Sequence, residues 1–192
     1  SQYHLGNMYG LGDGIPKNGK VALYWYTKAA EQGHAKAQFN LGNMHRVGEV
    51  IPQNSELAAY WFIKSAEQGH MVAQFNMGVA YAHGEGAPKN ISAALNWYNK
   101  AAEQGHAKAE YQLGLMHKRG DGVPQSDEAA VIWFTKSAAQ DNASAQFNLG
   151  LMFDEGKGVI ENSKTAAHWY TLATQQGYAE AQLSLALMYE VG

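Results

Sequence analysis

Two apolar patterns, each with helical spacing, follow one another between residues 35 and 70. In the first, Ala37, Leu41 and Met44 stand at positions i, i+4 and i+7, which lie on one face of a helix. The second has the related spacing i, i+3, i+4, i+7 and i+8, carried by Ala58, Trp61, Phe62, Ser65 and Ala66. The pattern therefore predicts a pair of helices, called helix A and helix B, joined by a short turn.

The helix pair repeats along the whole chain with a period of 36 residues. The segment that begins at Ala35 recurs, with substitutions, at residues 71, 107, 143 and 179. All five tryptophans fall in one register within helix B, at Trp25, Trp61, Trp97, Trp133 and Trp169. Repeats of about 20 to 50 residues are typical of solenoids, in which each unit buries its apolar face only against its neighbours. The tryptophans are thus expected to form a buried spine.

Glycine, proline and asparagine mark the ends of both helices. Helix A should end at the turn from Gly48 to Pro52, and Gly69 offers a left-handed stop for helix B. Five polar residues stand where helix B needs an N-cap acceptor: Asn18, Asn54, Asn90, Ser126 and Asn162. Because Val50, Asp141 and Ile160 replace the usual turn residues, these three turns are expected to differ locally.

The predicted fold is all-α: a right-handed α/α superhelical solenoid of about five 36-residue helix-turn-helix repeats and a final helix A. A glycine inside helix A lowers helix stability, so its recurrence indicates close approach of a neighbouring helix, at Gly6, Gly42, Gly78, Gly114 and Gly150. Residues 1–192 are predicted to form one domain. Its repeats are approximately 1–34, 35–70, 71–106, 107–142 and 143–178, with a partial repeat at 179–192.

The motifs of each repeat are Ala-x-Ala-Gln-x-x-Leu-Gly, a turn Gly-x-Gly-x-Pro-x-Asn, and Ala-x-x-Trp-Tyr-x-Lys-Ala-Ala-Glu-Gln-Gly, most complete in residues 90–124. They resemble the Sel1-like repeat family, relatives of tetratricopeptide repeats, over the whole chain. The resemblance implies an adaptor in signalling, in protein quality control or, in bacteria, in host contact or toxin inhibition. One cysteine-rich bacterial branch is associated with β-lactam binding. The absence of cysteine from this chain argues against that role.

Composition narrows the classes of partner. The charged fraction is 16% and the net charge is −3, so the chain lacks the polycationic surface that nucleic-acid binding needs. No apolar run reaches the roughly 18 residues of a membrane span, so no membrane insertion is expected. Cytoplasm and periplasm or secretion both remain open as compartments. Four lysines near the ends of helix B suit the helix dipole, can pair with Glu31, Glu67 and Glu103, and are interpreted as solvated structural charges: Lys28, Lys64, Lys100 and Lys136.

No residues with the spacing of a catalytic, cofactor or metal site emerge. His34, His70 and His106 recur at one position, but packed helices lie about 8–10 Å apart, too far for equivalent residues to share zinc. They are interpreted as structural residues at helix junctions. His45 and His117 fill a slot taken elsewhere by tyrosine or phenylalanine, and are interpreted as packed aromatic substitutes. The chain contains no Ser-x-x-Lys and no phosphate-binding loop.

Comparison of the repeats with one another separates constant positions, which build the stack, from variable positions, which are free to specify a ligand. The variable positions form one stripe on helix A, at i, i+4, i+7 and i+11, expected to line the concave surface. The residues predicted to bind a partner are Asn7, Lys36, Asn40, Asn43, Asn76, His83, Lys108, Gln112, Arg119 and Asn148. Asparagine amides both donate and accept hydrogen bonds, which suits an extended peptide. The alternative is that they bond only to the adjacent helix A or to water.

The favoured function is an interaction scaffold or adaptor that holds a protein or peptide in the concave groove. One alternative is an inhibitor or immunity-type protein that blocks a specific enzyme or toxin; a weaker one is an enzyme acting on β-lactams or the cell wall. Both ends of the chain fall inside a repeat, which suggests a fragment of a longer protein. The last helix A, with Leu183, Leu187 and Met188, is then open to a missing segment or to head-to-tail association with another copy.

Overall fold

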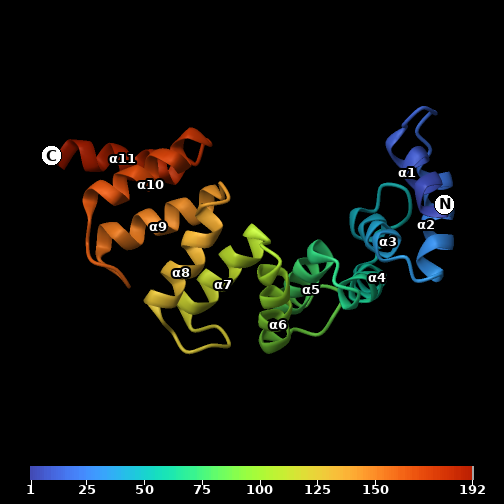
Figure 1. The fold of residues 1–192 in the computed structure, drawn as a ribbon, viewed down its shortest axis with the longest axis horizontal. Coiled ribbons are helices and arrows are strands. Elements are labelled where there is room, and N and C mark those ends of the chain that lie inside the picture. Colours follow the sequence, from blue (N-terminus) through green and yellow to red (C-terminus); the bar gives the residue numbers. More distant parts are fainter. Residues whose placement is uncertain (192) are drawn as a thin grey trace. The chain divides into compact units, whose positions relative to one another are not determined.

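The computed structural model describes residues 1–191, with side chains to residue 190; Gly192, the end of the predicted partial repeat, lies outside the described residues. Within that range the chain forms eleven α-helices and no strand. Their bounds are α1 Gln2–Leu11, α2 Gly19–Glu31, α3 Ala35–Val47, α4 Ser55–Glu67, α5 Met71–His83, α6 Ile91–Glu103, α7 Ala107–Arg119, α8 Asp127–Ala138, α9 Ala143–Glu155, α10 Ser163–Gln175 and α11 Ala179–Val191. Odd-numbered helices are the predicted A helices and even-numbered ones the B helices, so the all-α repeat fold is confirmed (Figure 1).

The predicted N-caps of helix B are confirmed. The side chain of Asn54 accepts a hydrogen bond from the backbone N–H of Leu57 at 2.9 Å, and Ser126 Oγ accepts one from Ala129 at 3.1 Å. Asn18, Asn90 and Asn162 do the same for α2, α6 and α10. Each cap satisfies one of the backbone donors that a helix start leaves without an intrahelical partner. The start of every helix B is therefore encoded by one residue.

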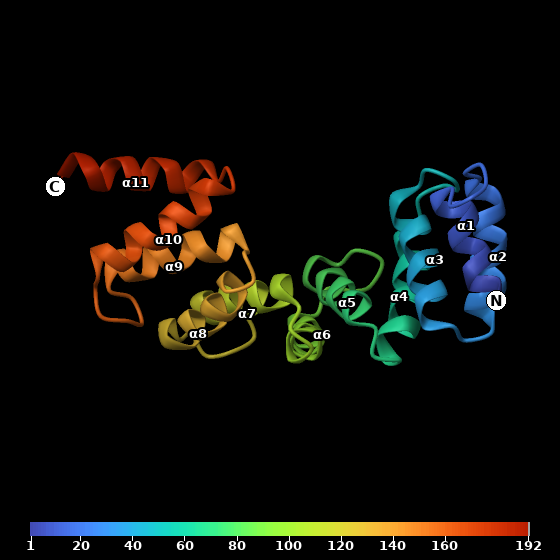
Figure 2. The ribbon, with the colours of Figure 1, turned by 45° about the horizontal axis from the view of Figure 1, so that its top comes forward.

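The chain divides into two compact units, residues 1–101 and the residues from 102 onward. In the first unit, α1 to α5 pack in succession, each helix against the next. In the second unit, α7 to α11 pack in the same way. These helix pairs can be followed inside each unit in Figure 2. A short helix pair in this arrangement buries its apolar face only by lying against its neighbours.

The most deeply buried aromatic ring of each repeat belongs to the residue that follows the tryptophan, so the predicted spine of buried tryptophans is confirmed only at Trp97. Phe134 and Tyr170 are fully buried, whereas Trp97 is 9% exposed and the other indoles are half-buried. Successive residues point about 100° apart around a helix, so only one of two adjacent aromatic rings can face helix A. The buried rings lie against the helix A glycines: Tyr26 on Gly6, Phe62 on Gly42, Tyr98 on Gly78, Phe134 on Gly114 and Tyr170 on Gly150. The predicted close approach at these glycines is confirmed.

Two of the tryptophan rings have a lysine over one face. Lys100 Nζ lies 4.3 Å from the ring centroid of Trp97, and Lys136 Nζ lies 4.4 Å from that of Trp133. Within the described residues, the lysines at the ends of helix B form no ion pair with Glu31, Glu67 or Glu103, so the possible pairing is not seen. A lysine three residues after an aromatic ring lies over that ring in a helix, where cation–π attraction holds it. These lysines thus shield the outer face of the tryptophans.

The three unusual turns behave differently from one another. Val50 takes the place of a left-handed glycine without adopting a positive φ, and it packs against Gly19, where a Cβ would lie 2.6 Å from Val50 Cγ2. Asp141 keeps the left-handed conformation, with φ 59°, and the glycines before Ile160 keep φ values of 64° and 69°. The predicted local change is thus present at Val50 and absent at Asp141 and Ile160. Asp tolerates the left-handed region, and Ile160 is 91% exposed.

A ladder of buried amides ties consecutive repeats together. Gln38, Gln74 and Gln146 are nearly inaccessible, and each donates from Nε2 to a carbonyl eight residues earlier, at 3.1, 3.2 and 3.3 Å. The oxygen of Gln146 in turn accepts a hydrogen bond from Gln176 Nε2 at 2.9 Å. In the fourth repeat Glu110 replaces the glutamine, 4% exposed, and accepts from Gln140 Nε2 at 2.7 Å. The carbonyl equivalent to those of the other repeats is that of Ala102. An ionised carboxylate has no hydrogen to donate to it, so this hydrogen bond is missing in the fourth repeat.

Replacing Glu110 by glutamine is therefore expected to stabilise the protein by about 1 kcal/mol at pH 7, the usual net contribution of one hydrogen bond. Burial raises the pKa of Glu110, so the folded protein holds this proton more tightly than the unfolded chain does. The stability of the wild type should fall as pH rises from the ordinary pKa of 4.5 toward the raised one. The advantage of Glu110→Gln should grow over the same interval in urea unfolding followed by circular dichroism.

Gln146→Glu is the matched control, because it places a carboxylate at the equivalent buried position in the next repeat. We expect it to lose stability at pH 7 and to recover part of the loss at pH 4. Equal stability of Glu110→Gln and the wild type at both pH values would contradict the role assigned to the ladder.

Candidate functional site

The recurring histidines are caps of helix A. Nδ1 of His34, His70 and His106 accepts a hydrogen bond from the backbone N–H three residues later, at 3.3, 3.3 and 3.2 Å. The ring of His70 also stacks on Phe39, with centroids 4.5 Å apart. The predicted structural role at helix junctions is confirmed. No group of three or more His, Cys, Asp or Glu side chains in residues 1–191 is arranged to hold a metal ion.

The two histidines of the other recurring position are half-buried, as the aromatic-substitute interpretation predicts. Nδ1 of both His45 and His117 is buried and has no hydrogen-bond partner among the described residues. Burial lowers the pKa of His45, since a charged imidazole is poorly solvated there. His45 therefore packs as a neutral ring, and His117 occupies the same half-buried position in its repeat.

In the first unit, the predicted stripe lies along α1, α3 and α5. Lys36 and His83 are exposed, and the asparagines between them are half-buried. Asn7 Oδ1 accepts a hydrogen bond from the hydroxyl of Tyr26 at 2.9 Å, and Asn43 Oδ1 accepts two from the Arg46 guanidinium at 3.3 Å. The remaining members of the stripe in this unit are Asn40 and Asn76. Part of the amide set is thus engaged within the protein.

In the second unit, the stripe combines exposed cations with inward-facing amides. Lys108 and Arg119 are exposed on α7, and Gln112 between them is half-buried. Asn148 is 9% exposed; it accepts a hydrogen bond from Lys118 Nζ at 3.3 Å and donates one to the carbonyl of Ser144 at 2.9 Å. The structure therefore brings Asn148 into the contact between α7 and α9, whereas Lys108 and Arg119 form no ion pair with any described residue.

A pocket of about 300 Å³ opens in the first unit where α3, α4 and α5 meet. Its walls are mostly small or apolar and include Ala58, Phe62 and Val79. Its polar residues are Arg46, Ser55, Asn76 and Glu85. The full lining is Arg46, Ser55, Ala58, Ala59, Phe62, Phe75, Asn76, Val79, Ala80 and Glu85. An apolar floor with a few polar groups is the usual composition of a site that takes a side chain. One predicted residue, Asn76, lines it.

An equivalent pocket of about 550 Å³ opens in the second unit where α9, α10 and α11 meet. Its lining is Leu151, Asp154, Ser163, Lys164, Ala167, Tyr170, Ser184, Leu185, Leu187, Met188 and Tyr189. Ser184 stands at the repeat position of Asn76, and Leu187 at that of Val79. Each unit thus offers the same kind of hollow between two consecutive A helices and the helix B between them.

One repeat position in these pockets is absent from the predicted site. Arg46 in the first pocket and Asp154 in the second occupy the same position of helix A, 108 residues apart. The side chain of Asp154 accepts a hydrogen bond from the buried hydroxyl of Tyr170 at 3.4 Å, and burial, together with the charge of Asp154, raises the pKa of Tyr170. The sequence signal was present, since this position changes from arginine to aspartate between repeats.

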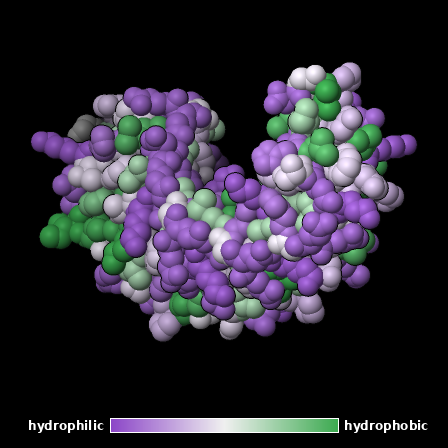
Figure 3. All heavy atoms as spheres, turned by 45° about the vertical axis from the view of Figure 1, so that its right-hand side comes forward, coloured by the Kyte–Doolittle hydropathy of each residue, from purple (hydrophilic) through white to green (hydrophobic). Residues whose placement is uncertain are grey.

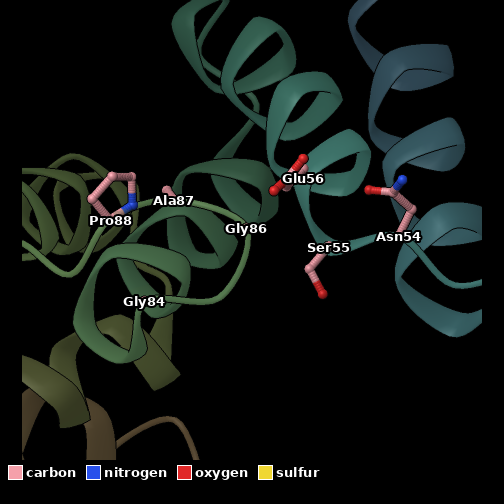
Figure 4. Close-up of a pocket in the computed structure, with 7 residues that line it drawn as sticks. All are labelled: Asn54, Ser55, Glu56, Gly84, Gly86, Ala87 and Pro88. Carbon is pink, nitrogen blue, oxygen red and sulfur yellow. The ribbon is translucent and has the colours of Figure 1, made fainter.

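The broad hollow drawn in Figure 4 is a junction between repeats. The turn with Gly84, Gly86 and Pro88 lies beside the start of α4 at Ser55 (Figure 4). A Cβ on Gly86 would overlap the carbonyl oxygen of Ser55, so backbone lies directly on backbone there. Its one titratable group is Glu56. This hollow thus holds the repeats together and offers little chemistry.

Apolar side chains at the surface occur in small groups among polar ones (Figure 3). On α11, Leu183 is 65% exposed and Leu187 is 52% exposed, while Met188 is half-buried. Among the described helices, none has the length and apolar character needed to cross a membrane.

The repeats match a known protein family. The family model "Sel1 repeat" matches residues 1–34, 35–70, 72–106, 107–142, 143–178 and 179–192. The chain belongs to the Sel1 repeat family. Sel1 repeat proteins are protein-interaction scaffolds and are generally not enzymes. The resemblance seen in the sequence is confirmed.

Solved structures of bacterial Sel1 repeat proteins share this fold. A protective antigen of uropathogenic Escherichia coli with an SLR fold is 36% identical, with a TM-score of 0.94 over 100% of this chain and 41% of that one. A Sel1 repeat protein of Oxalobacter formigenes is 37% identical, with a TM-score of 0.91 over 100% and 76%. The chain thus spans less than half the length of the E. coli protein.

A more distant structure, an immunity protein of Pseudomonas aeruginosa, is 25% identical, with a TM-score of 0.57 over 94% of this Sel1 repeat chain and 65% of that one. Among curated proteins, no relative matches the chain.

Proposed function

We propose that this Sel1 repeat chain binds a protein or peptide segment across the edges of its A helices, with side chains of the partner entering the inter-repeat pockets. The observation that carries the proposal is the recurrence of the same pocket in both units, at about 300 and 550 Å³. Both have apolar walls, and both open beside residues of the variable stripe. Ligand-binding pockets in proteins have this composition and this size.

The partner segment over α7 is acidic. Lys108 in the first turn and Arg119 in the last turn are exposed and form no ion pair within the described residues, and Lys118 lies next to Arg119. Exposed cations of one sign attract a segment of the opposite sign and fix its position. In this proposal Gln112 contacts the peptide backbone, and Asn40, Asn43 and Asn76 do the same in the first unit.

The test is a selection from a random peptide display library on the immobilised protein, followed by fluorescence anisotropy with the enriched peptides. We expect acidic peptides that bind one to one and lose at least about tenfold in affinity to Lys108→Glu with Arg119→Glu, since each contact contributes on the order of 1 kcal/mol. Raising the salt concentration should weaken the wild type and leave the double variant nearly unchanged.

Lys20→Glu with Lys89→Glu is the matched control. Both lysines are exposed, neither lies on helix A, and the net charge changes by the same amount as in the test variant. This control should bind as the wild type does. The proposal would be contradicted if the enriched peptides bound the Lys108 and Arg119 variant with unchanged affinity, or if the selection enriched no peptide.

An inhibitor or immunity role is the second candidate, and the observation that favours it is the fold shared with a Pseudomonas aeruginosa immunity protein. In that case the partner is one folded enzyme, and size-exclusion chromatography with light scattering should find a one-to-one complex. Competition by the selected peptides would then be weak, because a folded partner covers more surface than the pockets alone.

A further inference from the structure

We propose that the pocket between α9, α10 and α11 receives a cationic side chain, lysine or arginine, of the bound partner. This assignment rests on the proposed function, because the pocket is the second-unit member of the same set of hollows. It names the chemistry of the residue that enters.

The walls of the pocket match the aliphatic stem of such a residue. Leu151, Leu185 and Met188 line it from α9 and α11, and Leu187 on its edge is 52% exposed. Its volume is about 550 Å³, enough for one long side chain and the backbone that carries it. Lysine and arginine bury their methylene stems against apolar surface while the charged end reaches a polar partner.

The one charged group of the pocket that the core holds in a fixed position is the carboxylate of Asp154. The side chain of Asp154 is half-buried and is held by the hydroxyl of Tyr170, 3.4 Å away. Tyr170 is fully buried in the core, so its hydroxyl holds the carboxylate in place in the lining of the pocket. No lysine or arginine of the described residues forms an ion pair with Asp154. The carboxylate therefore has acceptor capacity for a cation from outside.

Lys164 also lines this pocket, and its positive charge repels an entering cation when its side chain points into the pocket. It is exposed in the first turn of α10 and forms no ion pair within the described residues. A free lysine on a flexible stem can turn into water, whereas Asp154 is held by the core. Removing the Lys164 charge should accordingly strengthen binding of a cation.

The first unit provides an internal comparison. There Arg46 occupies the position of Asp154, and its pocket also contains Glu85. Most of the walls are apolar in both pockets, and the same position of helix A carries a cation in the first pocket and an anion in the second.

The test uses the whole chain labelled with ¹³C at its methionine methyl groups, with Met188 reporting on the pocket and Met8 on α1 as internal reference. The probes are N-acetyl-lysine methylamide, the uncharged norleucine analogue and the glutamate analogue. The lysine probe should shift the Met188 signal saturably, with about fivefold higher affinity than the norleucine probe, as expected for one partly exposed charge pair. Asp154→Asn should abolish this preference, and Asp154→Arg should reverse it toward the glutamate probe.

Glu155→Gln is the matched control, because Glu155 is adjacent in sequence, is paired with Lys157 at 2.7 Å and does not line the pocket. It should leave the preference unchanged, and Lys164→Gln should increase it. Equal affinity for the lysine and norleucine probes would overturn the inference while leaving peptide binding through apolar side chains intact. Failure of the Lys108 and Arg119 test would instead affect the proposed acidic segment and leave Asp154 untouched.

Discussion

Replacing Gly86 by alanine is expected to lower the free energy of unfolding by about 2–4 kcal/mol, a large loss for a single added methyl group. Two costs add up. Gly86 has a φ of 75°, a left-handed conformation that costs an L-residue about 1–2 kcal/mol. In addition, the new Cβ would overlap the carbonyl of Ser55, and backbone on both sides leaves no side chain to move away.

Gly14→Ala is the control for this experiment, because Gly14 is the same turn position in the first repeat. Its φ is 72°, yet a Cβ there would meet nothing within 4 Å. It should therefore lose only the conformational part, about 1 kcal/mol. Urea unfolding of both variants, followed by circular dichroism, measures the difference. Equal losses would mean that the Gly86 turn does not bear on α4 as described.

The Gly86 contact also bears on binding. It sets the α5–α6 turn against the start of α4, and α4 and α5 supply most of the lining of the 300 Å³ pocket. The stability of a solenoid is close to a sum of contributions from its repeats and from the interfaces between them. A weakened junction at Gly86 therefore loosens the adjacent helices α4 and α5 first.

Gly114→Val is expected to cost about 3 kcal/mol or more. A Cβ at Gly114 would lie 2.6 Å from ring atoms of Phe134, and Phe134 is fully buried. The ring cannot rotate away without entering its neighbours in a close-packed core. Two further methyl groups have no space between α7 and α8. Thermal unfolding by calorimetry should register a lower midpoint and a smaller enthalpy.

Ala186→Val tests the same repeat position on α11, where the residue is exposed. Only the weaker helix propensity of valine should count there, roughly 0.5 kcal/mol. A Gly114→Val protein as stable as the Ala186→Val protein would show that the small residue in helix A is not required by packing.

The periodicity, the helix ends and the caps were all predictable from the sequence. Asn54 and His70 act on backbone groups three residues away, so their role depends on local order along the chain alone. The glycine of helix A was equally readable, since a residue that weakens a helix yet recurs five times points to a steric need. The tryptophan spine was predicted from the common register of the five tryptophans, which does not show which of two adjacent aromatic rings is buried more deeply.

The sequence by itself thus determined a Sel1 repeat chain of paired helices, because each boundary is encoded by residues within one turn of it. Only the tertiary structure decided which aromatic ring of each pair is buried more deeply, which buried amides bond between repeats, and that Asp154 lines a pocket. Those features depend on side chains about one repeat apart in the chain, whose distances and orientations follow from helix packing and are absent from the linear pattern.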